Sequence, residues 1–192
     1  LQFRMALYGS APRPQVDLGL LESGNSVEGR IEARRAMGFL LGVAESNGAD
    51  SIFLSAGLDS GGYVWPRMGF DCLLAWDLAE DVLDRMTVAK ANGLSQELYD
   101  KAAAIIAKPG SDMATKLAFL DDPVPVDMFN TIIRDASRSG GKQVKPTLGK
   151  LLLLRQGGSY TLPRAKFGVL RDWIKGQVMA VETGVLTFMD LD

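Results

Sequence analysis

The sequence has no histidine and only one cysteine, Cys72, among its 192 residues. A lone cysteine excludes an internal disulfide framework, and a chain without histidine has little means to build a zinc site. The same absence excludes Ser-His-Asp catalysis. We therefore set metal-dependent and triad mechanisms aside as function classes.

Long apolar runs and a strong excess of one charge are absent as well. The longest apolar runs, such as residues 151–154, are far too short to cross a bilayer, and no charged segment followed by an apolar one resembles a signal peptide. The net charge is −2 and the pI is about 5.3, which does not favour attraction to nucleic acid or to an anionic membrane. We expect neither partner, and a setting in the cytoplasm or in a virion.

The chain does have enough apolar material for a substantial core. Apolar residues make up 47% of the sequence, and the length fits one large domain or one domain with an appendage. The first residue is Leu1 rather than methionine, from which we expect a processed product or a segment of a longer polypeptide.

Apolar periodicity and Gly, Pro and Asn punctuation divide the chain into expected elements. Strand patterns occur at residues 2–8, 16–22, 51–56, 160–162 and 184–191, with a loop at 9–14. Helix patterns occur at residues 28–47, 73–91, 96–107, 126–138 and 166–175. Residues 148–155 fit either one strand of a hairpin or a helix, and residues 72–140 form a helical block.

Residues 49–71 are the most informative stretch of the chain. An apolar run at 51–56 breaks into a Gly/Asp loop, a short aromatic stretch follows, and Gly69-Phe70 closes the unit. This order predicts a strand, a loop, a short helix and a strand. Together with the amphipathic helix at 28–47, it makes a βαβ-like unit with a second short helix. The apolar face of that amphipathic helix consists of Ile31, Met37, Leu40, Leu41 and Ala44.

This order of elements resembles the core of the GNAT acetyltransferase superfamily, in which a helix, a strand, a short helix and a final Gly-Phe strand surround acyl-coenzyme A. The sequence GGYVWPRMGFD at residues 61–71 is similar to GNAT-like regions of phage head or virion proteins. The resemblance covers about residues 16–71. It implies an α/β (α+β) fold: one GNAT-like domain over residues 1–192, with a mixed sheet flanked by helices and with 72–140 as a helical insertion or subdomain.

The resemblance implies an acyl-coenzyme A-dependent N-acyltransferase that uses acetyl-coenzyme A and a small-molecule or protein amine as acceptor. The pyrophosphate would rest on backbone N–H groups where a turn enters a helix. In this sequence the corresponding residues are Ser26, Gly29 and Arg30, with Arg34 one turn further on. Ser26 replaces the family's Arg or Gln, and Ile31 stands where a small residue lets the backbone approach the phosphate. Glu28 adds a negative charge beside the anion, and we therefore expect weak binding of acetyl-coenzyme A or none.

The resemblance also assigns candidate catalytic residues. Glu22, at the end of the second strand pattern, or Asp59, in the loop after the third, would accept a proton from the amine. Tyr63 is the candidate acid for the leaving thiolate. Trp65 occupies the position four residues before the glycine where the family usually has tyrosine, and an indole N–H is too weak an acid for this task.

The same residues have a structural interpretation that needs no ligand. Residues 26–31 fit a capped surface helix, the aromatic residues of 61–70 fit a core, and a carboxylate at a strand end is often solvated. This interpretation leads to a second function class: a non-catalytic structural or interaction module of a phage particle, with a second copy or another virion protein as partner. Its partner-binding face would be the apolar stripe of the 73–91 helix, Leu78, Val82, Leu83 and Met86, with Trp76 as a core or interface anchor.

Overall fold

The computed structural model describes residues 2–8, 15–22, 27–56, 61–133 and 145–182, with side chains described at 34–55, 61–133 and 145–176. The chain divides into two compact units. Unit 1 comprises Leu1–Ser55 and Tyr160–Asp192, and unit 2 comprises Ala56–Ser159. The predicted helical block, 72–140, lies inside unit 2, and the fold is a mixed α/β arrangement as expected.

Unit 1 contains a mixed sheet and two long helices. Its strands are β1 (Gln2–Tyr8), β2 (Gln15–Glu22), β3 (Ser51–Ala56) and β5 (Gly158–Pro163), in the order β1-β2-β3-β5. Its helices are α1 (Val27–Ser46), η2 (Arg164–Lys166) and α8 (Phe167–Glu182). The strands predicted at 2–8, 16–22, 51–56 and 160–162 are confirmed, each within two residues.

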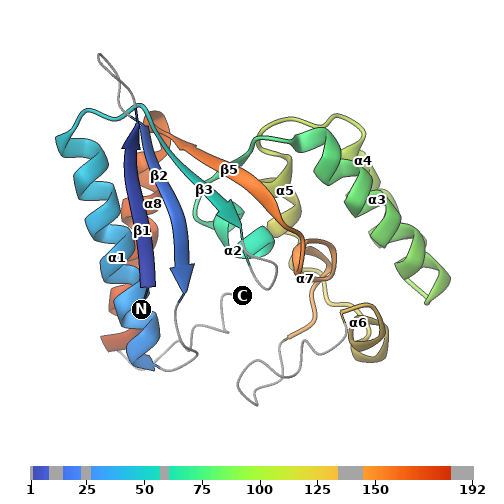
Figure 1. Ribbon diagram of the computed structural model, residues 1–192. Helices are drawn as coiled ribbons and strands as arrows, with labels where there is room; N and C mark the ends of the chain where they lie inside the picture. Colours follow the sequence, from blue (N-terminus) through green and yellow to red (C-terminus); the bar gives the residue numbers. More distant parts are fainter. Residues whose placement is uncertain (1, 9–14, 23–26, 57–60, 134–144, 183–192) are drawn as a thin grey trace. The chain divides into compact units, whose positions relative to one another are not determined.

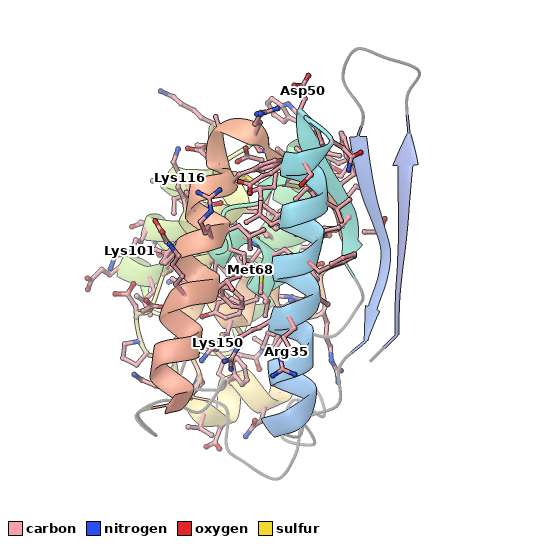
Figure 2. All side chains as sticks on the ribbon, turned by 90° about the vertical axis from the view of Figure 1, so that its left-hand side faces the viewer. Arg35, Asp50, Met68, Lys101, Lys116 and Lys150 are labelled. Carbon is pink, nitrogen blue, oxygen red and sulfur yellow. The ribbon has the colours of Figure 1, made fainter. Side chains whose placement is uncertain are left out.

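β2, α1 and β3 form a βαβ unit; of the unit predicted over residues 28–71, the long helix and the 51–56 strand are confirmed. β1 and β2 pair antiparallel, whereas β2 and β3 pair parallel, with α1 as the connection between them. α1 packs against β2 and α8. Figure 2 shows α1 and α8 side by side, with Arg35 on α1 and Asp50 at the start of β3. Of the predicted apolar face of α1, Met37, Leu40, Leu41 and Ala44 are buried.

α1 ends where the sequence punctuation predicts, and the backbone explains why. Gly48 has a φ of 64°, a left-handed conformation that favours glycine. Its N–H donates to the carbonyl of Glu45 and the next N–H, of Ala49, donates to Ala44. These two bonds form a Schellman motif, which satisfies carbonyls left over at the helix end.

Unit 2 is mainly helical, and its helices are labelled in Figure 1. Its elements are α2 (Gly61–Arg67), β4 (Asp71–Cys72), α3 (Ala75–Ala91), α4 (Gln96–Ile106), α5 (Met113–Ala118), α6 (Val126–Ile132) and α7 (Leu148–Leu153). β4 lies beside the first residues of β5, where the Leu73 N–H donates to the Ser159 carbonyl at 2.9 Å. The core of unit 2 includes Phe70, Met86, Leu117, Phe129 and Leu151.

For residues 148–155 the sequence left a hairpin strand and a helix open, and the structure shows the helix α7. Its four leucines are fully buried, so their pattern has no exposed face from which to read a period. Other predicted boundaries are wrong. α6 ends at Ile132, earlier than the predicted 138, and the short helix α5 was not predicted. In unit 1, α8 extends to Glu182, beyond the predicted 175. The predicted loop at 9–14 and strand at 184–191 lie outside the described residues.

The predicted Gly69-Phe70 strand is also wrong, because these two residues form the C-terminal cap of α2. Gly69 has a φ of 95° and donates to the carbonyl of Pro66, and the Phe70 N–H donates to that of Trp65. This is again a Schellman motif, and its apolar contact is the Trp65–Phe70 ring pair at 5.8 Å between centroids. The strand itself begins at Asp71, and in the unit 1 sheet the second neighbour of β3 is β5.

Candidate functional site

The first candidate site lies in unit 1, where β2 and β3 separate. The parallel pairs run from Gln15–Ser51 to Leu18–Leu54. In the described part of the two strands no pair joins Gly19–Glu22 to β3, although β2 continues to Glu22 and β3 to Ala56. Residues 19–22 of β2 therefore have backbone N–H and C=O groups, on the side that faces β3, with which another extended chain can pair.

α1 begins five residues after this opening. Its first N–H groups have no partner within the helix, and the aligned peptide dipoles favour an anion at this end. Figure 1 shows α1 following the end of β2 within unit 1. A parallel strand pair that opens beside a helix N-terminus can bind a ligand that has both amide groups and a phosphate group.

Four of the residues predicted from the sequence belong to this part of unit 1. Glu22 is the last residue of β2, and Gly29 and Arg30 lie in the first turn of α1, as expected. Arg34 lies on the next turn and is only 5% exposed, so α1 is buried at this position, whereas Arg35 is exposed. Ser26 and Asp59 lie outside the described residues.

Tyr63 lies in unit 2 and is buried. Its hydroxyl oxygen accepts a hydrogen bond of 2.8 Å from Arg67, and its ring lies between Arg67 at 5.4 Å and the Lys150 ammonium at 5.8 Å. Arg67 also donates to the carbonyl of Ala118 and pairs with Asp121 at 2.9 Å. The hydroxyl of Tyr63 is thus hydrogen-bonded to a cation that joins α2 to α5.

The backbone around this cluster is closely packed. A Cβ atom on Gly62 would lie 2.4 Å from the carbonyl oxygen of Gln156, and one on Gly149 would lie 2.6 Å from that of Leu117. Both distances are too short for a side chain, so glycine is required at these two contacts of α7. The cluster therefore lies where α2, α5 and α7 pack closely.

A groove on unit 2 was not predicted from the sequence. It has a volume of about 460 Å³, and its walls come from α3, α6 and the segment after α7. It is lined by Asp81, Asp84, Arg85, Val88, Thr131, Ile132 and Gln156. α3 was predicted correctly, but its contact with α6 was not. The periodicity of one helix shows which side is apolar and does not show which other helix packs against it.

Arg85 lines this groove and donates hydrogen bonds to the end of α7. Its Nη1 donates to the carbonyl oxygens of Leu152 at 3.2 Å and of Leu154. Burial lowers the pKa of the guanidinium, partly offset by the nearby charge of Asp81. Arginine nevertheless stays charged at neutral pH, so its charge is directed at helix carbonyls rather than at the groove opening.

Two further groups have altered proton affinity. Burial raises the pKa of the Cys72 thiol, which makes it a poor nucleophile. A hydrogen bond from Lys101 to Asp122, 2.6 Å long, raises the pKa of this exposed ammonium. Among the described residues, no group of three or more His, Cys, Asp or Glu residues is arranged to hold a metal ion.

Comparison of the sequence with protein-family models finds no matching family, and searches of curated proteins and of solved structures find no match. Within the described residues, no helix is both long and apolar enough to span a membrane.

Proposed function

We propose that this chain is an acyl-coenzyme A-dependent N-acyltransferase with a GNAT-like core. The observation that supports this most is the separation of β2 and β3 after Leu18 and Leu54, directly before the N-terminus of α1. Coenzyme A has an amide-containing pantetheine arm and a pyrophosphate. The arm can pair with the free edge of residues 19–22, and the pyrophosphate with the first N–H groups of α1.

The proposed reaction is a direct transfer. The acceptor amine attacks the thioester carbonyl carbon, a C–N bond forms and the C–S bond breaks. Glu22 takes the proton that the amine loses, and the leaving thiolate takes a proton from water. Tyr63, the candidate acid from the sequence, is buried in unit 2, where Arg67 donates to its hydroxyl, and it has no role in this scheme.

Titration calorimetry with acetyl-coenzyme A tests the binding step. We expect a dissociation constant above roughly 1 μM, a binding free energy weaker than about −8 kcal/mol, because Glu28 adds a negative charge at the helix N-terminus. Arg30→Glu should abolish the heat of binding, whereas the same charge change at Lys108, an exposed residue of unit 2, should leave it unchanged. No binding to the unaltered chain, or equal loss in both variants, would contradict the proposal.

A second candidate function is a non-catalytic interaction module, such as a structural component of a virion. It is favoured by apolar side chains that the 72–140 region leaves exposed. Trp76 is 70% exposed, and Leu73, Leu74, Leu83, Val88, Phe119 and Val126 are between 44% and 56% exposed. Sedimentation of the chain beside Leu83→Asp tests this role: a monomer in both cases, with no partner binding, would count against it.

A further inference from the structure

The exposed side of α3 combines apolar and acidic residues in a pattern that the folded chain does not use. Its buried side is complete: Leu78, Val82 and Met86 are at most 4% exposed. Trp76, Leu83 and Val88 are 70%, 44% and 50% exposed. Trp76 and Leu83 lie along one edge of the exposed side, and Val88 lies nearer its other edge, beside the groove. The stripe expected from the sequence to pack on the sheet or to face a partner helix is thus buried within the chain, except for Leu83. We refer to the exposed side of α3, from Trp76 to Val88, as the α3 ridge.

Four carboxylates occupy the middle of the α3 ridge. Asp77, Glu80, Asp81 and Asp84 are all exposed, and each has another of them three or four residues away, so they share one side of the helix. Like charges at this spacing repel one another. The ion pairs found between described side chains, such as Arg67–Asp121 and Lys101–Asp122, do not involve these four.

The two cations of α3 make hydrogen bonds away from the ridge. Arg85 donates to the carbonyl oxygens at the end of α7. Lys90 donates to the Leu94 carbonyl and lies 6.0 Å from the ring of Tyr99. The charge of Asp81 still acts on the guanidinium of Arg85, but the acidic residues of α3 outnumber its cations, so the helix has a net negative charge.

The groove between α3 and α6 extends the ridge on one flank. Val88 and Ile132 supply its apolar lining, and Asp81 and Asp84 supply acidic groups on the α3 wall. Its volume of about 460 Å³ can accept side chains that project from a partner. The ridge and groove together offer apolar contact with an acidic border.

The charge of this surface selects its occupant. A second copy related by a two-fold axis would place the same four carboxylates against one another, which disfavours a symmetric dimer through this face. Nucleic acid and anionic lipid are repelled for the same reason. A helical protein segment with apolar residues on one side and Lys or Arg beside them matches both the apolar and the acidic residues.

We propose that the α3 ridge binds a basic amphipathic helix of a partner protein. This inference rests on the interaction role offered as the second candidate function and is independent of coenzyme A binding. Trp76 and Leu83, two turns apart, are the expected apolar anchors. Asp81 and Asp84, beside the groove, are the expected partners of the cations.

The test uses the full chain and a fluorescein-labelled amphipathic Leu/Lys peptide of roughly 14 residues, a length at which helices become stable on binding. Fluorescence anisotropy should show binding that weakens with added salt. Trp76→Ala should weaken it by about tenfold or more, and the double variant Asp81→Asn/Asp84→Asn by about threefold or more at low salt. Circular dichroism verifies that each variant is folded, as expected for substitutions of exposed residues.

Two controls make the result specific. A peptide of the same composition with scrambled order keeps the charge but lacks an apolar face, and it should bind at least about tenfold more weakly. Val169→Ala removes an equally exposed apolar side chain from unit 1 and should leave the affinity unchanged. Absence of binding, equal affinity for the scrambled peptide, or equal affinity of the ridge variants would overturn the proposal. A chain that self-associates but binds no peptide would retain the interaction role and lose this inference.

Discussion

At the scale of single residues, Arg85 donates hydrogen bonds to the last carbonyl groups of α7, which at other helix ends are satisfied by a glycine cap or by water. α7 is six residues long, and its last carbonyls lie in the core of unit 2. One guanidinium from α3 donates to several of them, which satisfies groups that would be costly to bury unpaired. The position of this arginine is visible in the sequence, but its role is not.

We predict that Arg85→Ala lowers the free energy of unfolding by roughly 2–3 kcal/mol, the cost of leaving buried carbonyls unsatisfied. Arg85→Lys should recover only part of this, because an ammonium cannot reproduce the planar fork of donors. Urea denaturation measures both, with Lys90→Ala on the same helix as the control, expected to change stability by less than about 0.5 kcal/mol. A loss as small as that of the control would show that water replaces the arginine.

Cys72 gives unit 2 a dependence on alkaline pH. Burial raises the pKa of its thiol in the folded chain above the value in the unfolded chain. Below the unfolded pKa both states are protonated, and the contribution to stability is fully present. As pH rises through the unfolded value and then the folded one, the unfolded state releases its proton first, so this stability is lost.

We therefore predict that stability falls more steeply with pH above the ordinary thiol range in the unaltered chain than in Cys72→Ala. Thermal unfolding midpoints measured across this range supply the comparison. The variant loses some packing at every pH, so the relevant result is the slope and not the offset. Equal slopes would mean that the thiol does not contribute.

At the scale of elements, the Gly-Phe motif has a structural role that the resemblance did not indicate. Gly69 and Phe70 close α2 through two backbone bonds, and Trp65 packs against Phe70. The aromatic residue Trp65 is thus explained locally, because it makes the apolar contact of the cap.

We predict that Gly69→Ala costs about 1–2 kcal/mol, because a residue with a Cβ is strained at a φ of 95°. Gly38→Ala is the matched control: it lies within α1, a Cβ there would meet nothing within 4 Å, and the change should stabilise by up to about 1 kcal/mol. Denaturation midpoints of the two variants should move in opposite directions. A Gly69→Ala variant as stable as the parent would mean that the cap can rearrange.

At the scale of the whole molecule, the division into two units separates the candidate functions. The opening of β2 and β3 with the start of α1 belongs to unit 1, and the α3 ridge belongs to unit 2. Each unit has its own buried residues, such as Leu40 in α1 and Leu152 in α7. Because cooperative opening follows contiguous packed groups, the two units should also differ in local stability.

We predict that Leu152→Ala speeds amide hydrogen exchange in α3, α5 and α7 by an amount equivalent to about 2–5 kcal/mol, the cost of a cavity in a core. α1 and α8 should change much less. Leu40→Ala should give the reverse pattern. Exchange followed by mass spectrometry of peptic fragments resolves both units, and uniform acceleration in either variant would indicate a single cooperative unit.

The sequence by itself determined the elements whose apolar pattern has one buried face and clear punctuation. β2, α1, β3, α3 and α4 were predicted close to their ends, because period and terminal residues such as Gly48 and Asn92-Gly93 act locally. The sequence also excluded an internal disulfide and a Ser-His-Asp triad, because it has one cysteine and no histidine. Glu22 was correctly placed at a strand end, and Gly29 and Arg30 at a helix start, because these positions follow from element boundaries.

Only the tertiary structure decided what depends on contacts between distant segments. Residues 148–153 are buried on every side, so their leucines carry no period, and the helix was chosen by packing on α5. Three further features do not follow from spacing in the sequence. They are the bond from Arg85 to the carbonyl of Leu154, the cap formed by Gly69-Phe70, and the end of the β2–β3 pairing. The exposure of Leu83 was likewise decided by the elements that pack on α3. The apolar pattern of a helix predicts the direction of its buried side, but not how wide a part of the helix its neighbours cover.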